Sequence, residues 1–403
     1  MHMKILMVLY GSYPPDSRVR KEIKALSEVG HEMRVLCLSD DNKTETVDGT
    51  MVRSFSRKTA GFSVRGIKRP YYTLIKYTNP NLKKELEKEM GEGIDAVHVH
   101  DLPPAKTVLR TVDVPVILDL HENYQEAIRC YRSRKDVLEV LTSPRSVANR
   151  VFMPIRRYRR EQRRSMDLSN HVLAVVPEAK EDYQKSGIDG DKITVVSNTV
   201  DLEWFDEHST GDPSLETDNY LITYVGALSG PHRGLDTAVK ALPDIKSEVP
   251  DAKIRMAGRG SLRHELMDLA NDLGVGDSVE FTGWIDETTF PNYMRAADVG
   301  IVPHRSNPHT NTTVPHKLFQ YMAAELPVLA TDTTAVSRIV RETDAGVIVP
   351  AESPEEFAEG AIELADDDTR KKLGKNGREA VEKKYNWSRD GKRLQDVYDN
   401  LDV

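Results

Sequence analysis

The sequence repeatedly places a short apolar segment, a glycine-containing turn and an amphipathic helix one after another. The clearest example is Tyr220–Leu242, YLITYVGALSGPHRGLDTAVKAL. Leu221–Val225 is an apolar, β-rich run of the kind that forms a buried parallel strand. Gly226 ends this strand, and the spacing of the following apolar residues predicts a helix from about Leu235. Repeated strand–turn–helix units predict a parallel sheet.

The turn in this segment carries groups that attract phosphate. The start of a helix offers free backbone N–H groups and the positive end of the helix dipole. His232 and Arg233 lie at the edge of the turn, and arginine holds phosphate oxygens with two parallel N–H bonds. The alternative is an ordinary strand-to-helix turn with an exposed arginine, because glycine turns are common.

The same alternation runs through both halves of the chain. Met3–Tyr10, Val19–Gly30 and Met33–Leu38 predict a strand, a helix and a second strand, hence a right-handed parallel crossover. A length of 403 residues exceeds what one hydrophobic core supports. We therefore predict an α/β fold with two domains joined by an acidic, irregular linker: residues 1–200, linker 201–219 and residues 220–385.

Composition excludes several classes of protein. A net charge of -8 argues against a general nucleic-acid binder, so no nucleic-acid partner is expected. The only cysteines are Cys37 and Cys130, which favours a reducing compartment. Ile5–Tyr10 is apolar but short and lacks a cleavage site, so it predicts a first strand and not a signal peptide. We expect a cytoplasmic protein, with peripheral attachment to the inner face of the cell membrane as an extension of that prediction.

Two basic segments stand out in this acidic chain. Arg53–Lys76 holds seven Lys or Arg, interleaved with Phe and Tyr, and no acid. Arg145–Arg164 holds eight arginines against one acid, and its apolar residues predict one stripe of an amphipathic helix: Val151, Phe152, Ile155 and Tyr158. Such segments suit an anionic membrane surface or phosphorylated ligands. The alternative is a pair of solvated basic surfaces.

Polar residues follow the strands of the first half, at the carboxyl ends where open α/β sheets bind ligands. His121 and Glu122 follow a very apolar strand, and we expect His121 to face a ligand, with a loop-capping histidine as the alternative. His98 and His100 share one face of another strand. No cysteine or carboxylate cluster accompanies them in the sequence, so no metal site is predicted. Arg18 either faces the same ligand or is a surface arginine in an acidic neighbourhood.

Further cations follow strands in the second half. The turn Gly258–Ser261 contains Arg259 directly after a predicted strand. A helix is predicted from Pro315 to about Ala324, because proline suits the first helical position. Lys317 then lies in the first turn of that helix. A lysine beside a helix N-terminus is typical of a diphosphate site.

In this order, the segments resemble the retaining glycosyltransferases of family 4, which have the GT-B fold. The residues that carry the resemblance are YPPDSRVRKEIKALSEVGHE (13–32), LDLHE (118–122), VVSNTVD (195–201), YVGALSGPHRGLD (224–236), AGRG (257–260), VEFTGW (279–284) and VPHKLFQYMAAELPVLATD (314–332). The resemblance implies two Rossmann-like parallel-sheet domains that face a central cleft. The acceptor would bind the first domain and a nucleotide-sugar mainly the second. A C-terminal helix, about 386–403, would cross back to the first domain.

The resemblance also assigns residues. Arg233 matches the basic residue that binds the donor diphosphate, His121 matches the histidine that touches the transferred sugar, and Gly283–Ile285 would lie by the base. The expected catalytic residues are His121, Arg233 and Lys317. The expected donor-binding residues are Gly226, His232, Arg233, Gly258, Arg259, Gly283, Trp284, His309, Thr312, Thr313, Lys317 and Gln320. The expected acceptor-side residues are Ser12, Asp16, Arg18, His100 and Glu122.

The sequence departs from the family pattern at three positions. Members usually carry two glutamates eight positions apart, and the matching residues here are Thr312 and Gln320. An amide still hydrogen-bonds ribose hydroxyls, but a threonine supplies no carboxylate to the donor sugar. Ala227 stands where the family has its first phosphate-binding arginine. These departures indicate either an altered donor or lost activity.

The first functional hypothesis is transfer of a sugar from a UDP- or GDP-sugar to a lipid-linked or cell-envelope glycan, such as a polyprenyl-linked intermediate. Negative charge grows on the leaving β-phosphate, so fixed cations such as Arg233 and Lys317 serve the reaction and no metal is required. The resemblance implies that the leaving phosphate takes the acceptor proton. The alternatives are a nucleotide-sugar epimerase or hydrolase on the same fold, and a binding protein without catalysis.

Overall fold

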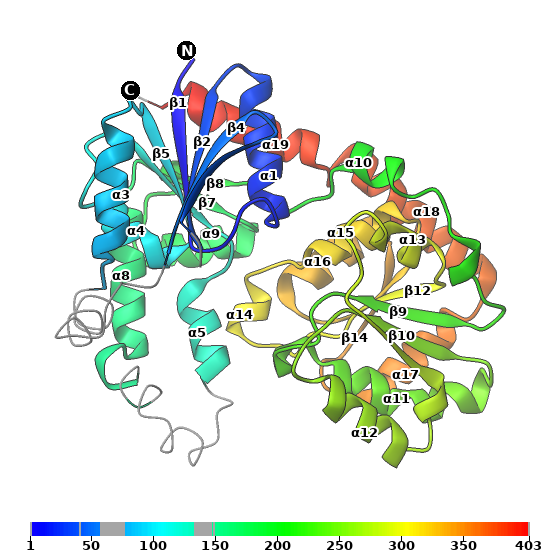
Figure 1. The fold of residues 1–403 in the computed structure, drawn as a ribbon. Helices are drawn as coiled ribbons and strands as arrows, with labels where there is room; N and C mark the ends of the chain where they lie inside the picture. The colour runs from blue at the N-terminus through cyan, green and yellow to red at the C-terminus, as the bar shows by residue number, and fades with distance from the viewer. Residues whose placement is uncertain (1, 40–41, 57–76, 133–146, 148–149, 402–403) are drawn as a thin grey trace. The chain divides into compact units, whose positions relative to one another are not determined.

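The computed structural model describes residues 2–39, 42–56, 77–132, 147 and 150–401. The chain divides into two units: residues 1–197 with 390–403, and residues 198–389. Each unit is built on one sheet with helices on both faces (Figure 1). Most of the basic segment Arg53–Lys76, from residue 57 on, lies outside the described residues, as do residues 145–146 and 148–149 of the second basic segment.

Unit 1 contains an eight-stranded sheet in the order β3-β4-β2-β1-β5-β6-β7-β8. Its strands are β1 (Lys4–Leu9), β2 (Glu32–Ser39), β3 (Lys43–Val47), β4 (Thr50–Ser56), β5 (Ala96–His100), β6 (Val116–Leu120), β7 (His171–Ala174) and β8 (Ile193–Val195). Neighbours are parallel except β3 and β4. The central strands β1, β5 and β6 are almost entirely buried, which accounts for their continuous apolar runs.

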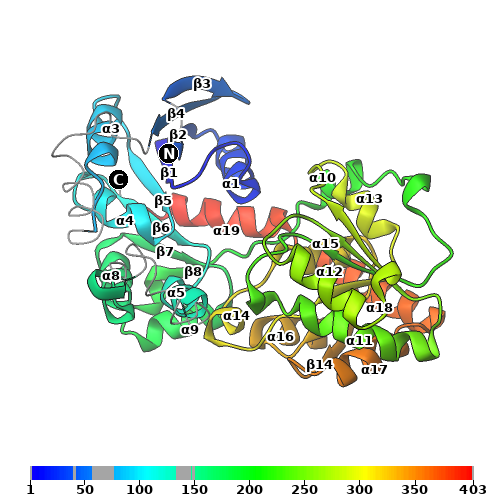
Figure 2. The same cartoon turned by 60° about the horizontal axis from the view of Figure 1, so that its bottom comes forward.

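The β3–β4 hairpin at one edge of this sheet was not predicted (Figure 2). Its turn residues, Asp48 and Gly49, have φ of 48° and 77°, the positive values that a two-residue type I′ turn requires. An Asp-Gly pair between two alternating segments is the sequence signal that would have identified the hairpin.

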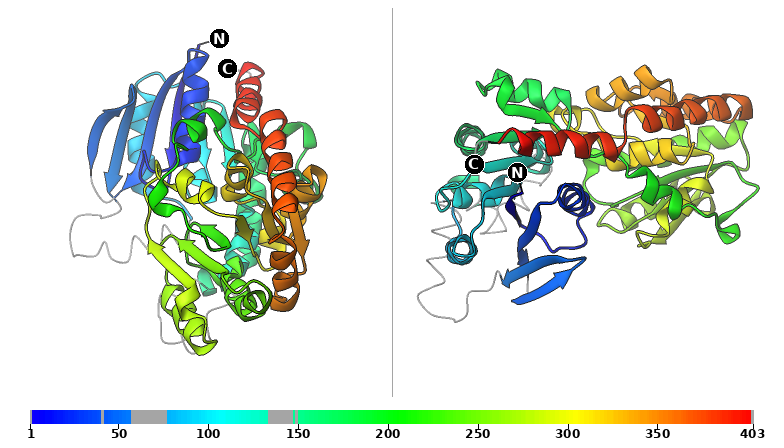
Figure 3. Two further views of the ribbon diagram at one scale, coloured as in Figure 1. Left: turned by 90° about the vertical axis from the view of Figure 1, so that its right-hand side faces the viewer. Right: turned by 90° about the horizontal axis from the view of Figure 1, so that it is seen from above.

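The helices of unit 1 are α1 (Ser17–Glu28), α3 (Pro80–Met90), α4 (Leu102–Val108), α5 (Tyr124–Arg132), α8 (Ile155–Leu168) and α9 (Pro177–Lys185). From Asp390 on, the last helix, α19 (Trp387–Asp399), also belongs to this unit (red in Figure 3). It packs there through a hydrogen bond between Tyr398 and His98 at 3.0 Å, and Gln395 donates to the Ala25 carbonyl at 2.7 Å.

Unit 2 contains a six-stranded parallel sheet in the order β11-β10-β9-β12-β13-β14. Its strands are β9 (Leu221–Val225), β10 (Lys253–Ala257), β11 (Val279–Gly283), β12 (Val299–Val302), β13 (Val328–Thr331) and β14 (Gly346–Val349). Its helices are α10 (Leu202–Glu207), α11 (Leu235–Glu248), α12 (Arg263–Asp272), α13 (Phe290–Arg295), α14 (Pro308–Asn311), α15 (His316–Ala323), α16 (Thr334–Thr343), α17 (Pro354–Glu363) and α18 (Asp367–Lys383). One hydrophobic core joins β9, β10 and β12 to α11, α12 and α17.

The sequence suggested that residues 201–219 are irregular. The structure shows that the first part of this stretch is ordered. The Asp201 side chain accepts a hydrogen bond from the Trp204 backbone N–H and caps α10, whose Phe205 is fully buried. Arg378 of α18 holds Asp206 at 2.7 Å. A cap, a buried aromatic residue and an ion pair therefore make the first part of this stretch a component of unit 2.

The predicted apolar stripe of the second basic segment does not form one helix. Pro154 is the N-cap of α8. Proline has no backbone N–H, so it cannot donate to the carbonyl of the preceding turn, and a helix that contains the residues before it is interrupted there. Val151 and Phe152 precede α8 and are exposed, Val151 by 66%. The buried face of α8 is instead more polar: Glu161, Gln162, Ser165 and Met166. None of the helices in the described part of the chain has the length and hydropathy that crossing a membrane needs.

Candidate functional site

A network of buried polar side chains lies near the carboxyl ends of β5 and β6 in unit 1. Arg18, at the start of α1, donates from Nε and Nη2 to the two carboxylate oxygens of Asp119, at 2.8 Å each. Its Nη1 donates to the Val196 carbonyl at 3.2 Å, and its Nε lies 2.9 Å from Glu22. Only 2% of Arg18 is exposed. Arg18 is therefore not the surface arginine of the alternative prediction, and it holds Asp119 in place.

His121, which directly follows β6, is fixed by two carboxylates. Its Nε2 lies 2.9 Å from Asp119 Oδ2 and 3.1 Å from His100 Nδ1, and its Nδ1 lies 3.7 Å from Asp101 Oδ2. Burial by itself would lower the pKa of His121, but Asp101 and Asp119 outweigh burial and raise that pKa to about 10. His121 is therefore an imidazolium at neutral pH, and 22% of its side chain is exposed.

Asp101 is a member of this network that the sequence did not identify. Its backbone has φ 63° and ψ 170°, a region that costs a non-glycine residue about 1–3 kcal/mol. In this conformation the Asp101 carboxylate accepts a hydrogen bond from the His121 backbone N–H at 3.2 Å. Burial raises the pKa of Asp101, and the His121 charge opposes that rise. No sequence signal reveals such a backbone conformation, because glycine is the usual residue there.

The structure also adds carboxylates to the two histidines of β5. Glu22, His98, His100 and Asp119 each offer one ligand atom, and these atoms all lie within 4.8 Å of one another. However, Arg18 already contacts both carboxylates, and burial followed by Asp119 raises the pKa of Glu22 to about 8. Burial lowers the pKa of His98 to about 4. The four residues therefore fit a closed network around the guanidinium better than a site for a divalent cation.

The remaining acceptor-side residues have separate roles. Asp16 caps α1, and its carboxylate accepts hydrogen bonds from the backbone N–H groups of Arg18 and Val19. Ser12 is exposed in the loop after β1, and Glu122 is half-buried beside His121. The structure thus brings Arg18, His100 and His121 together but leaves Ser12 outside the network.

Unit 2 gathers five basic side chains at the carboxyl ends of β9 and β12. We call them the basic cluster: His232, Arg233, His304, His309 and Lys317. The His232 ring centroid lies 6.4 Å from that of His304 and 5.5 Å from that of His309. Burial, and then the charges of Lys317 and Arg233, lower the pKa of His304.

Lys317 is the most unusual member of the basic cluster. It is 6% exposed, and its Nζ lies 3.4 Å from the centroid of the Tyr224 ring. Within the described residues this Nζ has no hydrogen-bond partner. Burial and then Arg233 hold the pKa of Lys317 well below its usual range. A Cβ at residue 226 would lie 2.8 Å from Nζ, so Gly226 allows the turn after β9 to approach the lysine.

The helix that carries Lys317 begins one residue later than predicted. Pro315 is the N-cap of α15 and His316 its first residue. Lys317 still lies in the first turn, as expected.

Arg233 and its neighbour shape the turn between β9 and α11. The Arg233 Nε donates to the Ser229 carbonyl at 2.8 Å. Gly234 has φ of 62°, and a Cβ there would lie 1.8 Å from the Pro303 carbonyl oxygen. Only glycine therefore allows this turn to contact the residues that follow β12.

His304 was not among the predicted site residues. It is 4% exposed, and neither ring nitrogen has a hydrogen-bond partner in the described part of the chain. Burial, followed by Lys317 and Arg233, holds the pKa of His304 well below its usual value. The available signal was its position two residues after the apolar segment that forms β12, and the same kind of position identified Arg259.

The turns after β9 and β10 contact each other. Gly258 has φ of 153°, and a Cβ there would lie 1.9 Å from the Gly226 carbonyl oxygen. Arg259 lies over the ring of Trp284, 6.0 Å from its centroid, and Trp284 is 60% exposed. Gly283 has φ of 80° and open space around its Cα. An exposed aromatic ring beside an arginine is a surface on which a planar base can stack.

Two of the three departures from the family pattern, Thr312 and Gln320, lie at α14 and α15. Thr312 ends α14, and its hydroxyl donates to the Pro308 carbonyl at 2.8 Å. Thr313 and Gln320 are half-buried. Burial lowers the pKa of His309 in α14 to about 4, so this histidine is neutral at pH 7.

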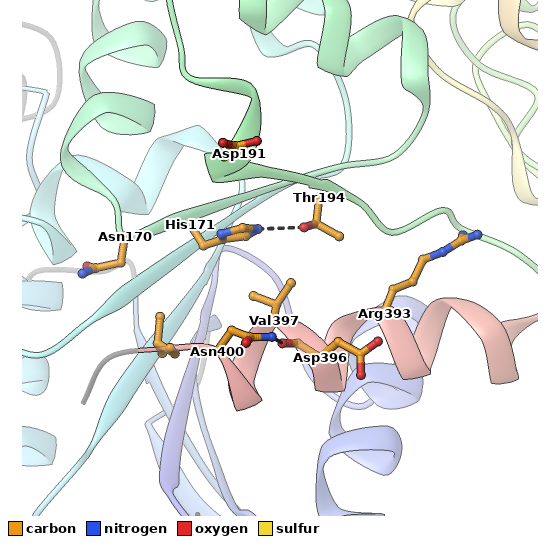
Figure 4. A pocket seen from close by; sticks show the side chains of 9 residues that line it. Asn170, His171, Asp191, Thr194, Arg393, Asp396, Val397 and Asn400 are labelled. Atoms are coloured by element: carbon orange, nitrogen blue, oxygen red, sulfur yellow. Dashed lines mark hydrogen bonds between the residues drawn. The ribbon is translucent and has the colours of Figure 1, made fainter.

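A pocket of about 490 Å³ lies elsewhere in unit 1 (Figure 4). Its lining residues come from α19 and from the amino ends of β7 and β8: Asn170, His171, Asp191, Thr194, Arg393, Asp396, Val397, Asn400 and Leu401. His171 Nε2 lies 2.9 Å from Thr194 Oγ1. Because the polar network lies at the carboxyl ends of the strands, this pocket is distinct from it.

Comparison with known proteins agrees with this geometry. Residues 17–204 match the model described as glycosyltransferase family 4, and residues 207–380 match that of the glycosyl transferases group 1. A phosphatidyl-myo-inositol mannosyltransferase of Mycolicibacterium smegmatis is 24% identical over 99% of this chain and 94% of its own.

Two solved structures share the fold. The sucrose-phosphate synthase of Thermosynechococcus elongatus superposes with a TM-score of 0.75 at 16% identity, over 99% of both chains. HepE of Anabaena, in complex with UDP and glucose, gives a TM-score of 0.72 at 15% identity, over 99% of this chain and 100% of that one. Together the two matched models cover residues 17–204 and 207–380, and they reach into both units. The chain therefore belongs to glycosyltransferase family 4, the group 1 glycosyl transferases, with the GT-B fold.

Proposed function

We propose that this glycosyltransferase is a retaining enzyme that transfers a sugar from a UDP- or GDP-sugar to a hydroxyl of a lipid-linked or cell-envelope glycan. The observation that carries the proposal is the basic cluster. Lys317 and His304 are buried there, and no carboxylate of the described residues forms an ion pair with Lys317. A diphosphate supplies the negative charge that such a cluster lacks. The UDP bound to the structurally similar HepE supports this class of donor.

The basic cluster suits the charge that develops during transfer. As the bond between the anomeric carbon and the β-phosphate oxygen breaks, negative charge grows on that phosphate. Arg233, Lys317 and the backbone N–H groups at the start of α11 stabilise it without reorganising. The acceptor oxygen forms the new bond, and its proton passes to the leaving phosphate. Because Arg233, Lys317 and these N–H groups meet the charge in the donor complex, transfer is expected to continue at an unchanged rate in excess EDTA.

His121 would act on the transferred sugar. As an imidazolium held by Asp119 and Asp101, it donates hydrogen bonds in a fixed orientation. A sugar hydroxyl accepts such a bond through its oxygen lone pairs. We therefore assign to His121 the orientation of the donor sugar.

The basic face of α8 supports a membrane-associated acceptor. Its exposed residues are mostly arginines, Arg156, Arg159, Arg160, Arg163 and Arg164, and exposed Val151 and Phe152 lie just before it. Exposed cations beside exposed apolar side chains suit an anionic lipid surface. The name of the mycolicibacterial relative, a phosphatidyl-myo-inositol mannosyltransferase, points to the same class of acceptor. On this proposal the enzyme is cytoplasmic and peripheral.

The first test is a thermal-shift series with UDP, GDP, UDP-sugars, GDP-sugars and the free nucleosides. A ligand at about 100 times its Kd stabilises a protein by roughly 2.7 kcal/mol. One nucleotide series is expected to raise the Tm of the wild type and to lose this effect in Arg233→Ala. Arg341→Ala, which removes an exposed arginine from α16, is the matched control and should keep the shift. Absence of a shift with every nucleotide would refute the proposed donor.

Product analysis separates the alternatives. Free sugar or an epimerised donor in the absence of acceptor would indicate a hydrolase or an epimerase. Donor binding without turnover on any acceptor would indicate a binding protein, an outcome motivated by Thr312 and Gln320 at the positions of the family glutamates.

A further inference from the structure

The basic cluster contains two buried groups, Lys317 and His304, whose polar side-chain atoms have no hydrogen-bond partner among the described residues. Lys317 Nζ has an aromatic ring on one side, 3.4 Å from the Tyr224 centroid, and the Gly226 turn on another. His304 is similarly enclosed, with both ring nitrogens unpartnered among the described residues. A buried cation without a counter-ion is unfavourable, so such groups release their protons in the free protein.

Among the described residues, the groups that interact with Lys317 are aromatic or basic: the Tyr224 ring, whose centroid lies 3.4 Å from Nζ, Arg233 and His304. The His232 ring centroid lies 6.4 Å from that of His304 and 5.5 Å from that of His309. Arg305 is neutralised by Asp236 at 2.8 Å and Glu352 at 3.4 Å. Burial followed by Arg233 lowers the pKa of Lys317, and burial followed by Lys317 and Arg233 lowers the pKa of His304.

We propose that Lys317 and His304 bind the diphosphate of the donor, and that binding of the diphosphate carries a proton from solvent into the basic cluster. This inference rests on the proposed nucleotide-sugar donor and adds to it the residues and the linked proton. A diphosphate beside the basic cluster raises the pKa values of Lys317 and His304, because an adjacent anion favours the charged form of an amine or imidazole. The proton goes to Lys317 Nζ or to the His304 ring, and the charged group then donates a charge-assisted hydrogen bond to a phosphate oxygen.

The proposal has a consequence for affinity. A ligand that binds together with a proton binds more tightly as pH falls towards the range in which that proton is readily available. Nucleoside diphosphate should therefore bind more tightly at pH 7 than at pH 9. The free nucleoside, which lacks phosphate, should show no such dependence.

Isothermal titration calorimetry of the full chain tests the proposal. Binding of the preferred nucleoside diphosphate is measured at one pH in two buffers that differ in ionisation enthalpy, such as PIPES and Tris. The difference in apparent enthalpy gives the number of protons taken up. We expect net uptake with the nucleoside diphosphate and with inorganic diphosphate, and none with the free nucleoside.

Variants locate the proton. Lys317→Met should weaken diphosphate binding roughly 10- to 100-fold, the usual effect of losing a charge-assisted hydrogen bond, and should abolish most of the uptake. It should also raise the Tm of the ligand-free protein, because a buried, unpaired amine is replaced by an apolar side chain of similar length. His304→Gln should reduce the uptake, and Lys375→Met, at an exposed site on α18, should leave affinity and uptake unchanged.

The outcomes distinguish this inference from the proposed donor. If the nucleotide binds the wild type without proton uptake, or binds Lys317→Met with unchanged affinity, the assignment of Lys317 is overturned while the donor stands. If no nucleotide binds the wild type, the donor proposal itself fails. A raised ligand-free Tm in Lys317→Met, together with lost uptake, confirms the inference in a folded variant.

Discussion

At the scale of single residues, both units contain buried ionisable side chains at their candidate sites. In unit 1 the charges compensate each other through Arg18, Asp119 and His121. In unit 2 Lys317 and His304 lack such compensation within the described residues. The first arrangement favours a preorganised network, and the second favours an anionic ligand.

The charge of His121 predicts a pH dependence of stability. Asp101 and Asp119 raise the pKa of His121 from 6.5 to about 10, so the folded protein binds this proton more tightly than the unfolded chain. The stabilisation is complete below the unfolded pKa of 6.5 and is lost as pH rises through the folded pKa. The difference in unfolding free energy between wild type and His121→Gln should therefore shrink from pH 6 to pH 10, by at most about 1.4 kcal/mol per pH unit. Urea unfolding across this range measures it, and a constant difference would contradict the raised pKa.

Arg18 predicts a large effect on stability. Arg18→Met leaves the Asp119 carboxylate buried with one cation fewer, and breaking a buried pair in this way costs about 3–5 kcal/mol. Arg110→Met, at an exposed arginine of the same unit, should change the unfolding free energy by no more than about 0.5 kcal/mol. Denaturant unfolding of both variants provides the comparison. Equal effects would show that the buried network does not stabilise unit 1.

At the scale of elements, glycine determines how closely the turns of unit 2 approach each other. The turns after β9 and β10 meet at Gly226 and Gly258, and the turn before α11 meets the end of β12 at Gly234. These contacts place cations from separate parts of the sequence around one point.

The effect of this close approach can be separated from the effect of positive φ. Gly258→Ala introduces a Cβ 1.9 Å from the Gly226 carbonyl oxygen, whereas Gly274→Ala, at φ 71°, places its Cβ in open space. Gly274→Ala should cost about 1–3 kcal/mol through backbone strain alone. Gly258→Ala should cost more and should also abolish stabilisation by nucleotide, as measured by denaturant unfolding and thermal shift. Similar results for both variants would show that the contact between the turns is unimportant.

Element boundaries were predictable where local chemistry sets them. The strands β1 and β9 follow from apolar runs, and the Asp16 side chain caps the start of α1. The start of α8 was not predicted, because the apolar spacing across Pro154 suggested one continuous helical stripe. Proline interrupts a helix even where the apolar periodicity continues.

At the scale of the whole molecule, the exposed arginines of α8 predict binding to anionic lipid. Substituting Arg156, Arg159, Arg160 and Arg163 with Gln removes four charges, each worth about 1 kcal/mol near an anionic surface. Sedimentation with phosphatidylserine vesicles should fall strongly, and that with phosphatidylcholine vesicles should not change.

The control for this prediction removes equal charge from another surface. Lys371, Lys372, Lys375 and Lys383 are exposed on α18, and their replacement by Gln should leave vesicle binding nearly intact. Equal losses in both variants would attribute the effect to net charge and would remove α8 as a specific membrane element.

The sequence alone determined the parallel α/β architecture, the family and the cationic turns, because apolar periodicity and residues that follow strands are local properties. The tertiary structure decided which charges are compensated. Arg18 and Asp119 lie 101 positions apart, and only the sheet brings them together. Asp101 acquires its role from a backbone angle, and His304 from burial beside Lys317. Electrostatic energy depends on distance and on exclusion of water, and neither is encoded in the spacing of residues along a chain.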